Sequence, residues 1–152
     1  PRLLSKVDVN SCIRAVSPDL NIANVEIGVM EKLRNGQVKI IPISSLPNSS
    51  LPIVKGAYFG WRMFVESSKP QFTWTEIYTH PKAPPRWIVY NPTVISADSR
   101  TATTKRTQYL SGGKATISAF WGFVGEEHPG EYEFKIQIND ETVCTFSVMV
   151  RR

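Results

Sequence analysis

The sequence holds few of the residues that build metal centres or covalent scaffolds. Its 152 residues include two cysteines and two histidines. Two cysteines exclude a disulfide-dense mini-domain and a four-cysteine zinc site. No H-x-x-x-H or C-x-x-C spacing is present, and both His80 and His128 precede a proline in a turn. We therefore expect no metal and no cofactor, and we expect both histidines to face solvent in loops.

Long hydrophobic runs and a dominant charge are also missing. No apolar stretch approaches the roughly 18 residues of a membrane-spanning helix, so we expect no such span. Lys and Arg total 18 against 13 Asp and Glu, a net charge of +5. The basic residues are dispersed, whereas a nucleic-acid surface gathers them on one face. Nucleic acid is therefore disfavoured as a partner.

Catalytic motifs are absent as well. The sequence contains no G-x-S-x-G elbow, no Walker loop and no dinucleotide fingerprint. Residues 111–114, Ser-Gly-Gly-Lys, lack the spacing of a phosphate loop and are typical of a hairpin turn. Glu126 and Glu127 are adjacent in a turn and would point to opposite sides, and the remaining carboxylates are interpreted as solvated. These features predict a protein that is not an enzyme.

What the sequence does contain is alternation of apolar and polar residues with period two, the pattern of strands with one buried face. It is clearest over 132–138, where every even position is apolar, and it resumes over 143–150 after Asn139-Asp140. Two such runs around a short polar turn predict a β-hairpin. We expect four side chains to face the core and to pair with the strand of Phe146 and Val148: Tyr132, Phe134, Ile136 and Ile138.

Further strands are expected at short, regular intervals. Asn35-Gly36 predicts a hairpin between 25–33 and 37–43. The Thr- and Lys-bearing run over 100–109 suits an edge strand. The remaining runs are 57–66, 72–79, 87–90 and 114–124. This spacing predicts an all-β fold, an immunoglobulin-like antiparallel β-sandwich, with a closed β-barrel as the alternative.

The domain limits follow from where the strand pattern begins. We expect residues 25–152 to form a single β-sandwich domain, preceded by an N-terminal extension over 1–24 with a short helix across 6–16. Cys144 shares its parity with Phe146 and is expected to be a small buried residue. Cys12 lies in a segment with no pairing signal, so we expect the two cysteines not to be bridged. The cellular compartment stays open.

Five short motifs follow one another along the chain: V-E-I-G-V over 25–29, I-V-K-G-A-Y-F-G-W-R over 53–62, Y-T-H-P over 78–81, P-G-E-Y-E-F-K-I over 129–136 and F-S-V over 146–148. Together they resemble the motifs of a bacterial domain-of-unknown-function family with an immunoglobulin-like β-sandwich. The resemblance spans residues 25 to about 150 and implies that fold, but it implies no established activity and no catalytic residues.

Aromatic residues are more numerous than one buried face per strand requires. Phe64, Ile77 and Phe120 have the opposite parity to neighbouring tryptophans, so some large rings are expected outside the core. Prolines at 81, 84 and 85 stiffen a loop between two aromatic strands. We expect an aromatic patch there that docks a protein partner, a neighbouring domain or a second copy. Its predicted residues are Trp74, Tyr78, His80, Arg86, Trp87 and Tyr90.

Two other functions remain open at this point. A carbohydrate-binding module would use the same rings, and flat, coplanar, exposed rings would favour it. Single-stranded nucleic acid binding would add Lys105, Arg106 and Lys114 to the aromatic residues.

Overall fold

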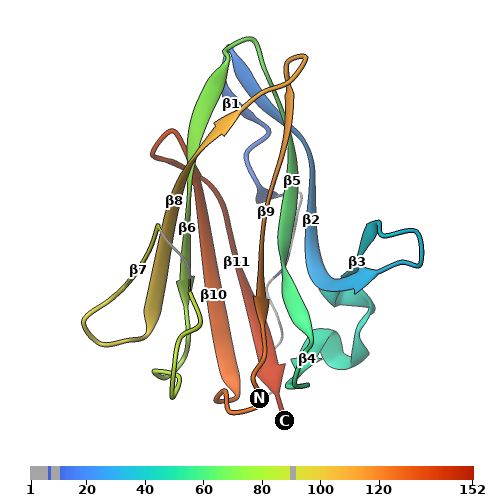
Figure 1. Cartoon of the computed structure of the whole chain (residues 1–152), viewed down its shortest axis with the longest axis vertical. Helices are drawn as coiled ribbons and strands as arrows, with labels where there is room; N and C mark the ends of the chain where they lie inside the picture. The colour runs from blue at the N-terminus through green and yellow to red at the C-terminus, as the bar shows by residue number, and fades with distance from the viewer. Residues whose placement is uncertain (1–6, 8–10, 90–91) are drawn as a thin grey trace.

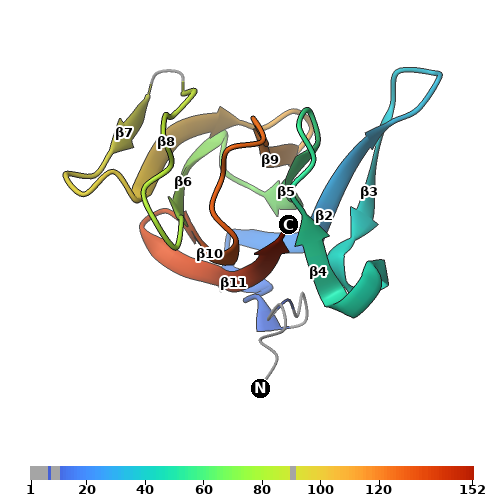
Figure 2. The same cartoon turned by 90° about the horizontal axis from the view of Figure 1, so that it is seen from below.

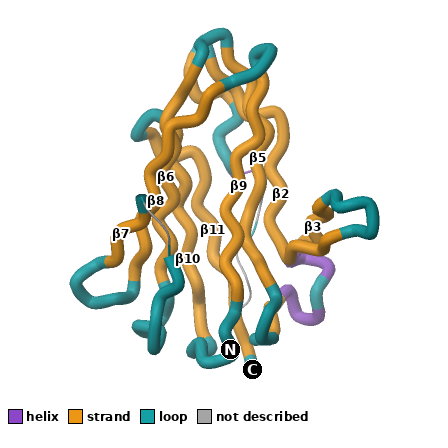
Figure 3. The backbone as a smooth tube through the Cα atoms, in the orientation of Figure 1, coloured by secondary structure: helices purple, strands orange, loops and turns teal. Residues whose placement is uncertain are grey.

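A computed structural model describes residues 7, 11–89 and 92–152, which form a sandwich of two β-sheets (Figure 1, Figure 3). Strands dominate, with two short 3₁₀ turns at Ile43–Ser45 and Pro47–Ser49. The strands are β1 (Ala15–Ser17), β2 (Leu20–Lys32), β3 (Val38–Pro42), β4 (Ser50–Pro52), β5 (Tyr58–Ser67), β6 (Gln71–Thr79), β7 (Thr93–Ile95), β8 (Thr101–Tyr109), β9 (Lys114–Gly122), β10 (Gly130–Ile138) and β11 (Glu141–Arg151).

The strands divide into two layers that face each other (Figure 2). The first sheet has the order β1-β2-β5-β9, with β3 also paired to β2. The second has the order β4-β11-β10-β6-β8-β7, and its β4–β11 ladder is the parallel one. Both sheets end in edge strands, so the fold is the predicted sandwich and the closed barrel is wrong.

Both predicted hairpins are confirmed, together with the turn chemistry that produces them. Between β10 and β11, Asn139 and Asp140 adopt φ of 49° and 65°, the left-handed conformation that the two-residue hairpin turn needs. In the β2–β3 turn, Gly36 has φ of 84°. Strand β10 pairs with the strand of Phe146 and Val148, as expected, with Tyr132 opposite Val148 and Phe134 opposite Phe146.

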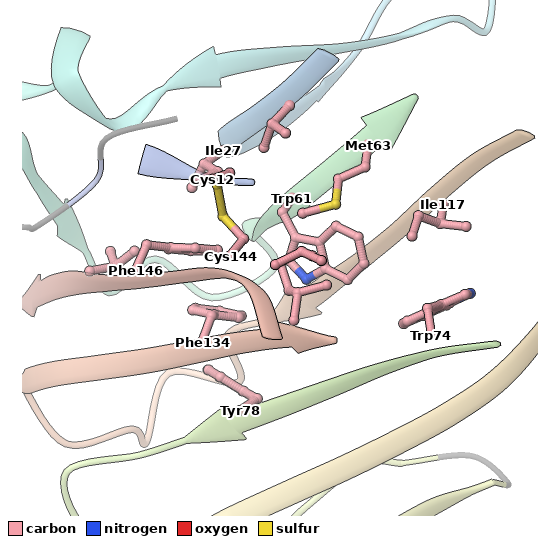
Figure 4. Packing of buried hydrophobic residues seen from close by; sticks show 14 of the residues in the cluster. Cys12, Ile27, Trp61, Met63, Trp74, Tyr78, Ile117, Phe134, Cys144 and Phe146 are labelled. Atoms are coloured by element: carbon pink, nitrogen blue, oxygen red, sulfur yellow. A yellow bond between two sulfur atoms is a disulfide. The ribbon is translucent and has the colours of Figure 1, made fainter. Parts of the chain in front are cut away.

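The core fills the space between the layers, and the alternating strands supply it from both sides. Phe134, Trp61 and Met63 are fully buried, and the ring of Phe134 stacks on that of Phe146 at 4.7 Å. Figure 4 shows side chains of the two sheets packed against one another across this layer. The four predicted core residues of β10 are all 0 % exposed.

Other local expectations need correction. Residues 87–89 are not a strand: the prolines before them and the bond from the Trp87 indole to Ser99 O hold this segment as a loop. The helix expected over 6–16 falls partly outside the described residues, and its last two positions belong to β1. Strand β8 is not an edge where β7 pairs with it, at residues 102–104. Strand β2 already begins at Leu20 and pairs with β5.

Cys12 and Cys144 form a disulfide, contrary to expectation. Both are buried, so the inference that Cys144 lies on the inner face of its strand holds. Beside the bridge, Ile13 N donates to Val143 O, and Arg14 O accepts from Ile22 N. The first bond holds the N-terminal segment against β11, and the second holds it against β2. The disulfide joins residues 132 positions apart, a pairing that no local pattern could indicate.

We expect Phe134→Ala to lower the free energy of unfolding by about 3–5 kcal/mol, because it removes a fully buried ring from between two packed sheets. Urea denaturation measures the loss. The neighbouring Lys135→Ala, on the exposed face of the same strand, serves as control and should change it by less than about 0.5 kcal/mol. Near wild-type stability of Phe134→Ala would contradict the packing described.

Removing the disulfide should cost about 2–5 kcal/mol, because the bridge closes a long loop and so restricts the unfolded chain. We expect reduction to raise the intact mass by that of a hydrogen molecule and to lower the melting temperature. The Cys12→Ala/Cys144→Ala variant is the control, because reductant should leave its melting temperature unchanged. Free thiols in the protein before reduction would show that the bridge is absent.

Candidate functional site

A buried carboxylate joins the two sheets at one side of the sandwich. Glu76 lies on the inner face of β6 and is 0 % exposed. Its Oε2 accepts from Trp61 Nε1 of β5 at 2.6 Å, and its Oε1 accepts from Trp121 Nε1 of β9 at 2.9 Å. Each oxygen thus has an indole donor from the opposite sheet, which compensates for part of the lost hydration.

Burial shifts the pKa values of two groups at this place in opposite directions. Loss of hydration raises the pKa of Glu76 to about 7, although the bonds from Trp61 and Trp121 act against this. Loss of hydration also lowers the pKa of His80 to about 4, helped by the nearby His128. His80 is therefore neutral at pH 7, while Glu76 is close to half-ionised.

Beside Glu76 the two sheets part and leave a cavity of about 340 Å³. Aromatic side chains make up much of its wall, and we call it the aromatic cavity; they include Trp74, Tyr78, Trp87 and Trp121. The Tyr78 ring lies 4.7 Å from that of Trp121 and 6.0 Å from that of Trp87. Trp87 Nε1 donates to Ser99 O at 2.8 Å, which holds the loop over 81–89 as the outer wall.

Two of the described residues that line this cavity carry a buried polar atom without a partner. Among the described residues, Trp74 Nε1 and His80 Nδ1 are buried and make no hydrogen bond. Arg86 and Arg106 also line the cavity and are exposed. Neither arginine forms an ion pair with a described residue, since the salt bridges there join Arg62 to Glu26 and Lys105 to Asp140. Unsatisfied buried groups are costly, so they mark a place where a ligand could supply the missing bonds.

The structure gathers five of the six predicted site residues around the aromatic cavity, and the sixth, Tyr90, lies outside the described residues. These five residues do not all lie at the surface, as an open docking patch would require. Trp74 and Tyr78 are 4 % and 2 % exposed, Trp87 is half-buried, and Arg86 is exposed. His80 is 5 % exposed and not a solvent-facing loop residue, because its ring packs between Tyr132 and Trp87.

Sequence reasoning missed the carboxylates of the site, which it interpreted as solvated. Glu76 shares its parity with Trp74 and Tyr78, and an acid on the apolar face of a strand was the signal that could have identified it. Glu127 is also buried: its carboxylate accepts from the backbone N–H groups of Val124 and Gly125 at 2.9 and 2.8 Å. That pairing depends on the shape of the loop, which sequence does not specify.

Comparison with known proteins agrees with this architecture. The profile of the PM0630 beta sandwich domain family matches residues 25–151. The chain belongs to this family. The crystal structure of an immunoglobulin-like protein, PA1606 from Pseudomonas aeruginosa, matches with a TM-score of 0.56 at 20 % identity. That match covers 90 % of this chain and 100 % of the other, and it places the PM0630 domain among immunoglobulin-like sandwiches.

Other comparisons add little. The DNA-bound alkylpurine DNA glycosylase AlkC of Pseudomonas fluorescens matches with a TM-score of 0.39 and 13 % identity, over 86 % of this chain and 31 % of that one. A similarity this distant supports no inference about the PM0630 domain. No curated protein sequence matches the chain.

The described part of the chain offers neither a metal-type cluster nor a membrane-spanning helix. No cluster of three or more His, Cys, Asp or Glu residues there has the arrangement of a metal site. No helix among these residues has the length and apolar character needed to cross a membrane.

The shifted pKa values predict a specific pH dependence of stability. Glu76 binds its proton more tightly in the folded state, so its contribution is complete below pH 4.5 and is lost as the pH rises to about 7. His80 acts oppositely: its contribution is present above pH 6.5 and is lost as the pH falls to about 4. In the wild type, the contributions of Glu76 and His80 to stability therefore change with pH in opposite directions.

We expect Glu76→Gln to remove the pH dependence of stability that comes from Glu76 and to leave the one that comes from His80. The free energy of unfolding of the variant should rise with pH between about 4 and 6.5. The difference in free energy of unfolding between the wild type and the variant should decrease between pH 4.5 and 7. That change should be on the order of 3 kcal/mol. Urea denaturation of both proteins across this pH range measures it. Parallel pH profiles would show that Glu76 does not titrate as described.

Proposed function

We propose that this domain is a non-catalytic binding module, and that a side chain of a protein partner enters its aromatic cavity. The observation that carries the proposal is a cavity of about 340 Å³ that combines aromatic walls with buried polar atoms lacking partners. Ligand sites in proteins have this composition: apolar and aromatic walls with a few polar groups that fix orientation.

A catalytic role has little support in the described residues. Catalysis at neutral pH commonly uses a carboxyl or imidazole whose pKa lies near 7 and which reaches the substrate. Glu76 has such a pKa, but it is 0 % exposed and both of its oxygens are engaged by indole donors. The shifted pKa is explained by burial at a bridge between sheets, without a substrate.

The ring geometry favours a protein partner over a sugar. Sugar platforms need flat, exposed rings, whereas Trp87 meets Trp121 at 75° and Tyr78 at 85°. The rim adds exposed apolar side chains, with Tyr58 47 % and Ile88 57 % exposed, and such residues beside a hollow are typical of protein contacts.

Nucleic acid binding is disfavoured by the placement of the basic residues. Lys105 and Arg106 are neighbours in β8 and therefore point to opposite faces of the sheet. Arg106 lines the cavity, while Lys105 is paired with Asp140. The basic run is thus divided between two surfaces and forms no continuous track for a phosphate backbone.

A displayed random-peptide library and a glycan array, both applied to the purified domain, test the proposal. We expect enriched peptides and no bound glycans. Trp87→Ala should weaken binding of the selected peptides by about 2 kcal/mol or more, as aromatic hot spots do. Its own stability should fall by less than about 3 kcal/mol, because the ring is only half-buried.

Tyr109→Ala is the matched control, because Tyr109 is a 69 % exposed aromatic residue that does not line the cavity. Melting temperatures of both variants separate lost binding from lost folding. Arg86→Ala, which changes an exposed residue of the cavity rim, should weaken peptide binding without lowering the melting temperature. Glycan binding in place of peptides, or peptides bound equally by Trp87→Ala and wild type, would overturn the proposal.

A further inference from the structure

Strand β9 ends its sheet with a free edge, and this edge borders the aromatic cavity. Just beyond the ends of the β5–β9 ladder, Ser67 N donates to Gly113 O and Phe123 N donates to Ala57 O. Hydrogen bonds alternate along antiparallel strands, so the odd-numbered residues of β9 turn their backbone groups toward β5. The even-numbered ones turn theirs outward: Thr116, Ser118, Phe120 and Gly122.

The outward groups of β9 have no strand partner in the described part of the chain. Strands β8 and β9 form no ladder with each other, and the bridge between Ser111 and Lys114 lies at the turn that joins them. Ser118 and Gly122 are exposed and line the cavity. A row of free N–H and C=O groups therefore runs along one side of the cavity.

The other edge strands are protected, and β9 is not. Strands β1, β4 and β7 have three residues each and β3 has five, and β3 and β4 both end in proline. Short length and proline are the means by which proteins prevent unwanted pairing at sheet edges. Strand β9 has nine residues, no proline and a single lysine at its start. Its edge is the one best able to accept another strand.

The opposite sheet extends past β9 and provides a floor for such a strand. Trp121 of β9 packs on Tyr78 of β6, so β9 lies over β6, while β8 and β7 continue outward (Figure 2). In the β6–β8 ladder, Arg106 lies directly opposite Trp74 and shares its inner face. A segment beside β9 would therefore lie over Arg106 and Trp74.

The unpaired groups on this part of the opposite sheet favour an acidic side chain as their ligand. Arg106 has no ion-pair partner among the described residues, and Trp74 Nε1 is a buried donor without an acceptor. Arg86 adds a second guanidinium at the rim. The carboxylates nearby are already engaged, Glu76 by two indoles and Glu127 by two backbone N–H groups. A carboxylate is the acceptor that suits both an unpaired guanidinium and an indole N–H.

We propose that an extended acidic segment of a partner protein adds to β9 as a new edge strand and places a carboxylate side chain beside Arg106 and Trp74 in the aromatic cavity. The proposal rests on the protein-binding function proposed above and specifies its mode. Backbone bonds to the outward groups of β9 provide affinity, and the side chain in the cavity provides specificity, as in other strand additions. A folded second copy suits this place less well, because β8 and β7 project past β9 and obstruct a globular partner.

The test uses two displayed libraries of peptides about as long as β9, one with glutamate and one with lysine at the central position. We expect enrichment from the glutamate library alone. A selected acidic peptide should bind Arg106→Glu at least about tenfold more weakly than wild type. The same charge reversal at Arg34→Glu, in the exposed turn between β2 and β3, is the matched control and should change affinity less than about twofold.

Amide hydrogen exchange measured by NMR reports strand addition directly. With the selected peptide bound, the amides of Thr116, Ser118 and Phe120 should exchange at least about tenfold more slowly, because they become hydrogen-bonded. The free edge of β3 should stay unprotected. Ser118→Pro removes one outward donor without touching the β5 ladder, so it should weaken peptide binding and leave the melting temperature nearly unchanged.

The outcomes separate this proposal from the function on which it rests. Peptides that depend on Trp87 but leave the β9 amides unprotected would overturn strand addition while the binding module stands. Enrichment from the lysine library would overturn the acidic partner. Dimers of the domain that protect the β9 amides without peptide, seen by sedimentation, would show that the occupant is a second copy. A library that yields no peptide at all would overturn both proposals.

Discussion

The carboxylate of Glu76 lies between two sheets, and its two oxygens accept hydrogen bonds from tryptophans on two different strands. Removing a carboxylate from water is costly, and each indole N–H restores part of what is lost. The arrangement works only while β5, β6 and β9 keep their relative positions, because a small displacement leaves a buried acid without its donors. The interaction therefore couples the register of the sheets to the shape of the cavity beside them.

The cavity exists because the two sheets differ in extent. Beyond β6 the second sheet continues into β8 and β7, while the first sheet stops at β9 (Figure 1). The loop over 81–89 covers the opening only partly, anchored by the bond from Trp87 to Ser99. Aromatic side chains that would be ordinary core elsewhere thus become the walls of a cavity, and one of them, Trp74, keeps a buried Nε1 without a partner among the described residues.

A second long-range constraint lies on the far side of the core. The Cys12–Cys144 disulfide holds the N-terminal segment against β11, within the buried cluster that includes Phe134 and Phe146 (Figure 4). The segment before Val25, which the family profile does not cover, is thereby part of the packed structure over its described residues. Covalent and hydrogen-bonded contacts at opposite sides of the sandwich fix how the two sheets meet.

The sequence by itself determined what depends on neighbours along the chain. Alternation along β10 and β11, and the Asn-Asp and Asn-Gly turns, predicted strands, faces and hairpin register correctly, because strand periodicity and turn dihedral angles are local properties. The same reasoning located five residues that the fold gathers at one cavity. The tertiary structure alone decided which of these are buried, that Glu76 is a bridge, and that Cys12 reaches Cys144. Those outcomes depend on which strands face each other across the sandwich, and two sheets can be stacked in many ways without altering the alternation within any strand.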